Sequence, residues 1–217
     1  MGMALAVWRS DPSVVVVGLP RGGVPVAYEV AVALAVPLDI LIVRKIGVPF
    51  HPEMAMGAIG EDGVVVVDKK VMAMAGVSEA AFKAVERHER SELERRRVLY
   101  TSERAPLSLH DKTVILVDDG IATGSTVRAA SRVARLRGAS RIMLGVPVAS
   151  FEAIDLLRAD VDSFVALEVV AGSFSVGEWY LRFDQTSDRE VMECLRRADR
   201  RAPHPHSVGI VHGVGVG

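Results

Sequence analysis

The sequence predicts an α/β fold, in which helices cover both faces of a parallel sheet. Short, wholly apolar runs such as 14–17 and 114–117 alternate with segments of helical pattern. Strands that are buried on both faces have this composition, and their alternation with helices is typical of parallel sheets. Half of the 217 residues are hydrophobic, so the chain can bury a sizeable core as one domain.

Composition and charge exclude several classes of protein. The formal net charge of −1 offers no global attraction to nucleic acid. The single cysteine, Cys194, excludes an internal disulfide and a cysteine-rich zinc site. The longest apolar stretch, 24–43, is interrupted by Glu29, Pro37 and Asp39 and cannot span a membrane. The first residues make a poor signal peptide, so we expect a soluble cytoplasmic protein without nucleic-acid or membrane partners.

The first part of the chain predicts strands, one helix and a hairpin. Val14–Val17 is a run of β-branched residues that ends at Gly18, which is typical of a buried strand. Gly60–Gly63 separates two apolar runs and predicts the turn of a hairpin. The expected elements are a strand at 14–17, a helix at 24–35, a strand at 38–43, and hairpin strands at 55–59 and 64–67.

A long, strongly charged helix is expected from Ser78 to Tyr100. Ser78 can cap its start, and several acidic residues stand four positions before basic ones, a spacing that stabilises helices. These pairs are Glu79/Lys83, Glu86/Arg90 and Glu92/Arg96. Arg95–Arg97 could attract an anion, although a solvated face or a subunit contact is the simpler interpretation.

The last part of the chain continues the alternation and then loses it. Gly138 is a good stop for the helix that follows the strand at 113–117. The expected elements after it are a strand at 141–146, a helix at 151–158 and a strand at 163–167. From Arg201 onward the chain has no helical period, and we interpret 201–217 as a disordered tail or linker. Its three histidines lack a rigid frame, so a metal site there is disfavoured.

The most informative segment is a strand that ends in two carboxylates and leads into a loop rich in glycine and hydroxyls. Asp118 and Asp119 end the strand and can accept hydrogen bonds from vicinal hydroxyls. Free amides at a helix N-terminus bind phosphate, and Gly120 and Gly124 let the backbone approach it. This predicts a sugar-phosphate site, with ribose on the carboxylates and a 5′-phosphate on the loop. The expected phosphate-binding residues are Gly120, Ile121, Ala122, Thr123, Gly124, Ser125 and Thr126.

Four ordered motifs resemble those of the type I phosphoribosyltransferases, and most closely those of a bacterial group of proteins with this domain. The motifs are Leu19–Gly23, Arg44–Gly47, Pro52–Ala58 and Asp118–Gly124. The resemblance implies a Rossmann-like parallel sheet with a small hood, phosphoribosyl pyrophosphate as the donor, Mg²⁺ as the cofactor, and a homodimer as a common state. It implies one domain over 1–200, with hood elements near 48–68 and 168–186.

Cations in two of these motifs suit a pyrophosphate group. Leu19–Gly23 follows the first strand and aims the Arg21 guanidinium and several amides at the same sheet edge. By resemblance, Arg21 and the backbone of Gly22 hold pyrophosphate, in a loop that often has a non-proline cis peptide. Arg44 and Lys45 end the second expected strand and can neutralise a leaving pyrophosphate, or be ordinary surface charges. We favour a functional role for Lys45.

Residues that would contact the acceptor are matched less completely. Phe174 matches the residue that stacks on the purine in hypoxanthine-guanine phosphoribosyltransferases, and a core role is the alternative. Glu53 is a general base by position or a surface residue, and Trp179 and Tyr180 are interpreted as strand residues that pack the hood or core. Ala122 replaces the aspartate of the 6-oxopurine enzymes, which disfavours such a substrate.

The resemblance implies a transferase that moves the phosphoribosyl group to a nitrogen acceptor, with a nucleobase expected, and releases pyrophosphate. Arg21, Lys45, Asp118 and Asp119 are the expected catalytic residues, and Mg²⁺ is held by the donor, through water on the two carboxylates. A non-catalytic regulatory protein that binds phosphoribosyl pyrophosphate or a nucleotide is the alternative. Transfer to a non-base acceptor, or hydrolysis of the donor, also stays open.

Overall fold

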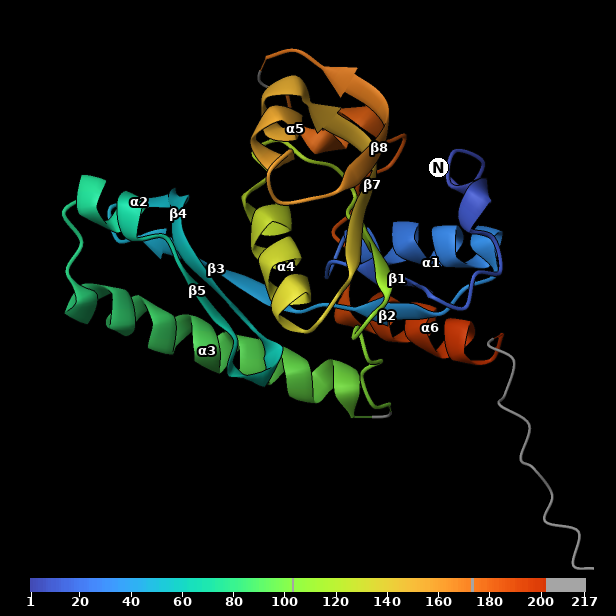
Figure 1. Ribbon diagram of the computed structural model, residues 1–217, viewed down its shortest axis with the longest axis horizontal. Helices are drawn as coiled ribbons and strands as arrows, with labels where there is room; N and C mark the ends of the chain where they lie inside the picture. The colour runs from blue at the N-terminus through green and yellow to red at the C-terminus, as the bar shows by residue number, and fades with distance from the viewer. Residues whose placement is uncertain (103, 173, 202–217) are drawn as a thin grey trace, which may run out of the picture.

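The chain folds around two sheets, described by a computed structural model for residues 1–102, 104–172 and 174–201, without the side chains of Glu53 and Asp62. The larger sheet is parallel and has the strand order β2-β1-β6-β7-β8 (Figure 1). Its strands are β1 (Val14–Gly18), β2 (Leu38–Ile40), β6 (Thr113–Val117), β7 (Arg141–Ser150) and β8 (Ser163–Val170). The parallel α/β architecture that the sequence predicts is confirmed.

Helices bury the parallel sheet from two sides. Val14 and Val16 of β1 face one core with α1 (Gly23–Leu34) and α6 (Asp188–Asp199). Val15 and Val17 face a second core with α4 (Ser125–Leu136) and α5 (Phe151–Leu157). Alternate residues of a strand point to opposite faces, which is why an unbroken valine run serves both cores. The edge strand β8 differs, because Phe164, Leu167 and Val169 remain partly exposed on it.

A second structural unit, which we call the arm, extends away from the parallel sheet. It contains an antiparallel sheet of β3 (Val43–Val48), β4 (His51–Gly60) and β5 (Val65–Val67), with α2 (Lys69–Met74) and α3 (Glu79–Thr101) (Figure 1). The expected hairpin is present as β4 and β5, joined by a short 3₁₀ helix at Glu61–Gly63. Two further 3₁₀ helices span Ala6–Trp8 and Val176–Trp179.

The expected strand at 38–43 is wrong in its second half. β2 ends at Ile40, and Val43 already pairs with Gly60 in the antiparallel sheet. The chain therefore changes sheets within one apolar run, since Leu41 and Ile42 are buried between the two sheets and need no polar turn. Arg44–Gly47 consequently lies in the arm and not at the end of a parallel strand.

The charged helix forms as expected, from Glu79 to Thr101. Ser78 caps it by accepting a hydrogen bond from the Ala81 amide at 3.2 Å. The pairs Glu86–Arg90 and Glu92–Arg96 are formed at 2.6 and 3.1 Å, whereas the pair Glu79/Lys83 is not found among the described side chains. No helix in the described ranges combines the length and apolar character that crossing a bilayer requires. The predicted tail lies outside the described residues from 202 onward.

Candidate functional site

Two loops that are far apart in the sequence meet at the carboxyl edge of the parallel sheet. β1 and β6 are neighbours in register, with Gly18 beside Val117, and the Leu19 amide donates to the Val117 carbonyl at 2.9 Å. A Cβ atom built on Gly22 would lie 1.8 Å from Oδ2 of Asp119. A side chain at that position would require the loop or the Asp119 carboxylate to shift, so the Arg21 loop passes in direct contact with this carboxylate.

Asp118 and Asp119 follow directly after β6, and each carboxyl affects the pKa of the other. The Asp119 amide donates to Oδ1 of Asp118 at 3.0 Å. Burial raises the pKa of the Asp118 carboxyl well above its usual range, and the Asp119 charge raises it further. Burial also raises the pKa of the Asp119 carboxyl. Hydroxyl donors or a cation at this point would stabilise the ionised pair, which is what a ribose diol or a metal-bound ligand supplies.

The expected phosphate loop is anchored to the next strand, β7. Ile121 makes a parallel bridge to β7, and its amide donates to the Val148 carbonyl at 2.9 Å. Ser150 Oγ donates to the Ala122 carbonyl at 2.8 Å. Sequence reasoning missed Ser150, because nothing local links it to a loop nearly thirty residues earlier. These contacts hold the loop backbone in place without using its own hydroxyl groups.

The end of the loop leaves an open helix N-terminus. Gly124 has φ of +75°, a conformation that favours glycine, and it directly precedes α4. The first helical hydrogen bond runs from the Arg128 amide to the Gly124 carbonyl at 2.9 Å, so the amides before it lack helical acceptors. The hydroxyls of Thr123 and Ser125 lie 3.0 Å apart and add donors. The arrangement is suited to an anion.

A cleft of about 450 Å³ opens between the Arg21 loop and the segment at 180–186. Arg21, Gly22 and Asp119 line one side of the cleft, and Asp184 contributes to the other. Arg21 follows a cis peptide bond after Pro20, as the resemblance leads us to expect. Arg21 Nη1 lies 4.0 Å from Oδ1 of Asp188 at the start of α6.

Tyr180 is a site residue whose role the sequence interpretation misjudged. It follows the 3₁₀ helix instead of lying in a strand, and it lines the cleft. Its hydroxyl donates to the main-chain carbonyl of Asp119 at 2.6 Å, and its ring centre lies 5.1 Å from that of Phe183. Burial and the nearby Asp119 and Asp118 charges raise the pKa of Tyr180 to about 12, so the hydroxyl remains a donor at neutral pH.

Phe174 lies beside the phosphate loop, in a different cleft. This second cleft, of about 440 Å³, is lined by Ala122, Thr123, Ser150, Glu152, Gly172 and Phe174. The Val176 side chain packs on Gly120, where an added Cβ would lie 2.6 Å from Cγ1 of Val176. Stacking of Phe174 on a base stays a prediction, but the ring is on the loop side of the site and not beside Arg21.

Arg44 and Lys45 are not brought to the cleft. Arg44 Nη2 lies 2.7 Å from Oε2 of Glu89, so this guanidinium ties β3 to α3. Lys45 sits in β3 opposite Ala58, and neither residue lines the cleft. The strand that carries both residues belongs to the arm, and their contact with pyrophosphate stays a prediction. The Glu53 side chain lies outside the described residues.

The donor set for a metal consists of two carboxylates. Within the described ranges, no group of three or more histidine, cysteine, aspartate or glutamate side chains is placed to hold a metal ion. Asp118 and Asp119 can still contribute oxygens to an ion that takes its other ligands from phosphates and water. Mg²⁺ is bound in this way in many sites that handle phosphates.

Comparisons with known proteins place this geometry in a family context. Residues 3–178 match the phosphoribosyl transferase domain. Two curated proteins of Mycobacterium tuberculosis, provisionally named phosphoribosyl transferases, are 48% identical over 191 residues, or 88% of this chain. The match covers 43% of their length, so the chain spans less than half of these relatives.

One solved structure has the same fold over most of both chains. TT1426 from Thermus thermophilus is 38% identical, with a TM-score of 0.81 over 90% of this chain and 92% of its own. A hypoxanthine phosphoribosyltransferase from Staphylococcus aureus is 13% identical, with a TM-score of 0.46 over 80% of this chain and 70% of its own. The second likeness is too distant to say anything about an acceptor.

Proposed function

The chain belongs to the phosphoribosyl transferase domain family, and from this premise we propose that it transfers the phosphoribosyl group of phosphoribosyl pyrophosphate to a nitrogen acceptor. A nucleobase is the acceptor class that we expect. The observation that carries the proposal is the convergence of three groups on one edge of the sheet. They are the Arg21 loop, the Asp118–Asp119 pair and the open N-terminus of α4.

Each group suits one part of the donor. The amides and hydroxyls at 123–126 suit the 5′-phosphate, because they form an uncapped, positively polarised helix end. The carboxylates of Asp118 and Asp119 suit the ribose hydroxyls, since carboxylates accept hydrogen bonds from a diol. The Arg21 guanidinium suits the pyrophosphate, which carries most of the negative charge.

The chemistry that we propose is a substitution at the anomeric carbon. The bond from that carbon to the pyrophosphate oxygen breaks and its electron pair leaves with pyrophosphate. The acceptor nitrogen forms the new bond and releases its proton to solvent or to a base. Arg21 stabilises the charge that builds up on the leaving group, and this is where a fixed cation lowers a barrier most.

The carboxylate pair also fits Mg²⁺ held jointly with the donor. Asp118 and Asp119 would hold the ion through one or both carboxylates or through water, with phosphate oxygens completing its coordination. When bound, Mg²⁺ would add positive charge at the pyrophosphate. Arg21 and Arg182 both line the cleft, so the ion would add to the positive charge that these arginines supply.

Pyrophosphate release tests the proposal directly. The protein is mixed with phosphoribosyl pyrophosphate and Mg²⁺, and with purines, pyrimidines or no acceptor, beside the variant that carries both Asp118→Asn and Asp119→Asn. Release that depends on one base and disappears in the variant is the expected result. Donor binding by calorimetry without any release would favour the regulatory alternative. Absence of donor binding would contradict the assignment of the phosphate loop.

A further inference from the structure

We propose that Tyr100 and Asp188 are positioning residues for Arg21, and that through it they set how tightly the cleft binds a pyrophosphate group. The inference rests on the proposed function, and it concerns contacts behind the cleft rather than in it. The three residues come from the arm, from α6 and from the loop after β1. Their meeting point therefore joins three separate segments of the chain.

Both contacts meet on one oxygen atom. Oδ1 of Asp188 accepts a hydrogen bond from the Tyr100 hydroxyl, and the same Oδ1 lies 4.0 Å from Nη1 of Arg21. Asp188 is the first residue of α6, and a capping box between Ser187 and Glu190 defines that helix start. The carboxylate is thus held by the helix on one side and by the tyrosine on the other.

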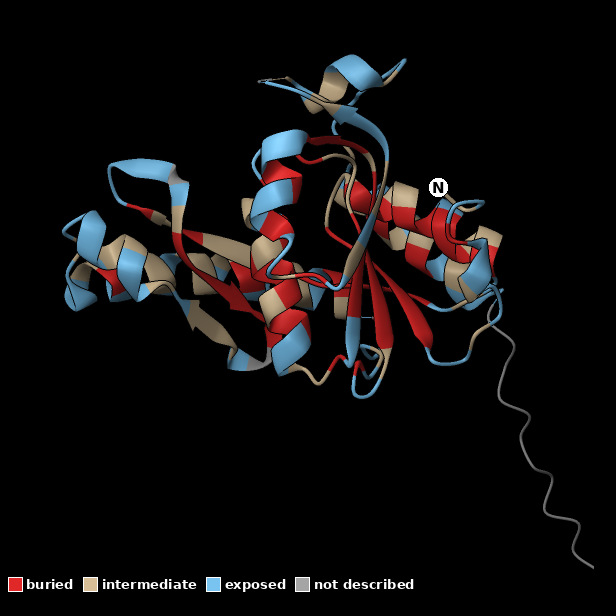
Figure 2. Cartoon of the chain, turned by 45° about the horizontal axis from the view of Figure 1, so that its top comes forward, coloured by how far each residue is buried: buried red, intermediate tan, exposed pale blue. Residues whose placement is uncertain are grey.

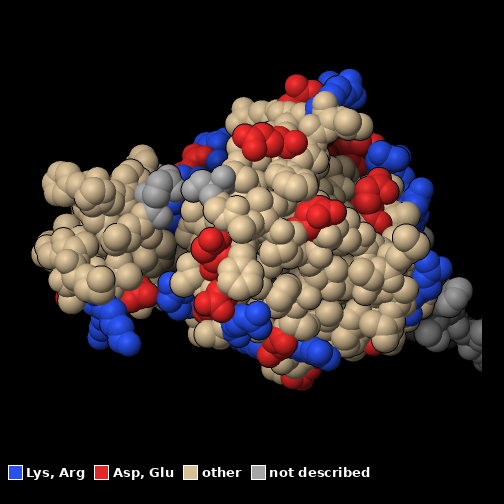
Figure 3. All heavy atoms as spheres, turned by 90° about the horizontal axis from the view of Figure 1, so that it is seen from above, with Lys and Arg blue, Asp and Glu red and all other residues tan. Residues whose placement is uncertain are grey.

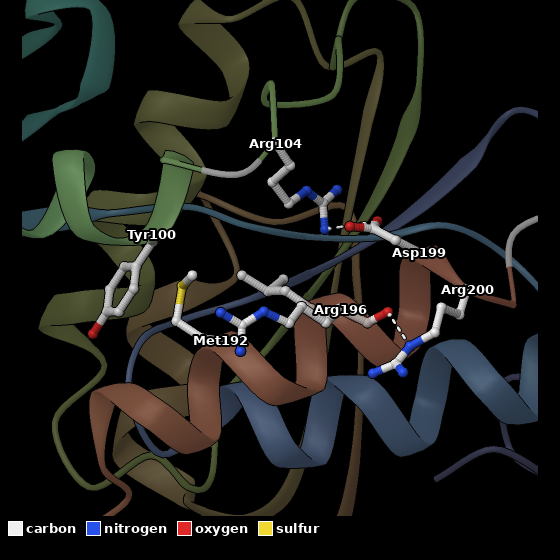
Figure 4. Close-up of a pocket in the computed structure, with 7 residues that line it drawn as sticks. Tyr100, Arg104, Met192, Arg196, Asp199 and Arg200 are labelled. Carbon is white, nitrogen blue, oxygen red and sulfur yellow. Dashed lines mark hydrogen bonds and ion pairs between the residues drawn. The ribbon is translucent and has the colours of Figure 1, made fainter.

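Tyr100 is buried, and its hydroxyl makes a hydrogen bond to Asp188. The residue is 1% exposed and lies near the end of α3. Figure 4 shows its ring at the wall of a cavity between α3 and α6, with the hydroxyl directed away from the other labelled side chains. A buried hydroxyl without a partner is costly, so the bond to Asp188 is needed for Tyr100 to be buried here.

The arginines at the cavity beside Tyr100, which has a volume of about 320 Å³, do not account for the contact between Tyr100 and Asp188. Arg104 Nη1 lies 3.2 Å from Oδ1 of Asp199, and Arg200 Nη2 lies 3.5 Å from Oε1 of Glu193. Two of the cationic groups at the cavity therefore already have acidic partners. The contact that leads from this region to the cleft is the one through Asp188.

The charges around Asp188 explain why its orientation matters. Arg21 approaches it from the cleft, and Arg95 of α3 also interacts with it electrostatically. If Tyr100 did not fix Oδ1, the carboxylate could turn toward the α3 cations and leave Arg21 without a partner. A pre-positioned guanidinium loses less freedom when pyrophosphate binds, so affinity is higher. The 4.0 Å contact is loose enough to yield to pyrophosphate.

A double-mutant cycle on ligand binding tests this role. Calorimetry with two probes, phosphoribosyl pyrophosphate plus Mg²⁺ and pyrophosphate plus Mg²⁺, compares wild type with Tyr100→Phe, Asp188→Asn, Arg21→Gln and the Tyr100→Phe/Arg21→Gln double variant. We expect Tyr100→Phe to weaken binding of both probes about fivefold, the equivalent of one hydrogen bond. In the Arg21→Gln background the same change should have no further effect, because Arg21 carries its influence.

A matched control separates positioning from general loosening of the fold. Tyr28 is a buried tyrosine of α1, and no hydrogen bond of its hydroxyl is found among the described residues. Tyr28→Phe should leave binding of both probes within twofold of wild type. Thermal unfolding of every variant shows whether a binding loss comes with a loss of folding.

The outcomes distinguish failure of the proposed function from failure of the positioning role of Tyr100 and Asp188. Wild type that binds neither probe overturns the proposed function and this inference with it. Wild type that binds both probes, with equal losses from Tyr100→Phe in the presence and absence of Arg21, overturns the inference alone. Unchanged binding in Tyr100→Phe and Asp188→Asn also overturns the inference alone. A binding loss in Tyr100→Phe that disappears in the Arg21→Gln background supports the inference.

Discussion

The motif residues at the carboxyl edge of the parallel sheet and those in the arm make different kinds of contact. At the sheet edge, backbone contacts and glycine close approaches place polar groups, as where Gly22 meets Asp119. In the arm, side-chain ion pairs such as Arg44–Glu89 join strand to helix. Figure 2 shows the central parallel strands as mostly buried, while the arm carries more intermediate and exposed surface.

The arm also exposes several large apolar side chains. Phe50 is 89% exposed and Met74 is 84% exposed, and Met54 is also exposed. Figure 3, which looks down from the top of Figure 1, shows the projecting end of the arm as largely uncharged. Arginines of two motifs therefore make different contacts. Arg21 lines a cleft, while Arg44 pairs with Glu89 and connects β3 to α3.

The largest effect should come from closing the contact between the two loops. Gly22→Ala would place a Cβ atom 1.8 Å from Oδ2 of Asp119, so either the Arg21 loop or the carboxylate must move. We expect donor affinity to fall by about 100-fold or more, since several ligand groups are displaced together. Calorimetry with phosphoribosyl pyrophosphate and Mg²⁺ measures it.

A glycine of β7, Gly145, provides the control for that substitution. Gly145→Ala meets as its nearest neighbour the sulfur of Met1, at 3.2 Å, and a flexible side chain can give way. Donor affinity should therefore stay within a few fold of wild type. Equal losses of donor affinity in the two variants would mean that any added methyl group disturbs the protein. The close approach of Gly22 to Asp119 would then not explain the loss.

The next effect separates the two arginines. Arg21→Gln removes the cation of the Arg21 loop, one of two arginines that line the cleft, and we expect donor binding to weaken about 10- to 100-fold, as for a lost charge-assisted contact. Arg44→Gln should leave donor binding within twofold of wild type. It should lower the free energy of unfolding by about 1 kcal/mol, because it breaks a partly buried ion pair with Glu89. Donor binding and denaturant unfolding are measured for both variants. A larger loss of donor binding in Arg44→Gln than in Arg21→Gln would contradict the roles that we assign to the two arginines.

A third effect concerns pH and the carboxylate pair. Burial raises the pKa of Asp118 in the folded protein above the ordinary value of 3.8. The folded state therefore holds this proton more tightly than the unfolded state, and that contribution is fully present below pH 3.8 and lost as pH rises through the raised pKa. Ligand-free wild type should lose stability relative to Asp118→Asn over this window, by at most about 1.4 kcal/mol per pH unit. Denaturant unfolding from pH 4 to 8 measures the difference, and a flat difference would contradict the raised pKa of Asp118.

The smallest effect should come from the tyrosine that joins the 180–186 segment to the site. Tyr180→Phe removes the hydrogen bond to the Asp119 carbonyl and keeps the ring against Phe183. We expect a loss of about 1 kcal/mol in stability and a change in donor affinity of no more than a few fold. Unfolding and calorimetry provide both numbers. A much larger loss of affinity would show that the hydroxyl contacts the ligand itself.

Much of the fold was predictable because it follows from local patterns. The strand at 113–117 and the Ser78 cap are found where the sequence places them, since buried runs and capping residues act over a few positions. The sheet change at Leu41 and Ile42 was not predictable, because an apolar run has the same composition whichever sheet it enters. That change of sheet puts Arg44 and Lys45 in the arm instead of at the end of a parallel strand.

The candidate site shows the same division. The carboxylate pair, the phosphate loop and Arg21 could be proposed from sequence, because each is a short motif after a strand. Tyr180 and Ser150 were missed, since their hydroxyls act on backbone carbonyls of the Asp118–Ala122 segment from distant parts of the chain. Only the tertiary fold brings such residues within hydrogen-bond distance of the loop.

By itself the sequence determined the alternation of elements, the family and the chemical types at the sheet edge, because these depend on residue order over short distances. The tertiary structure alone decided that Arg21 reaches the cleft while Arg44 does not. It also decided that Asp188 and Tyr100 stand behind Arg21. The physical reason is that strand pairing and helix packing set the distances between charged groups far apart in the chain, and those distances govern their electrostatic interactions.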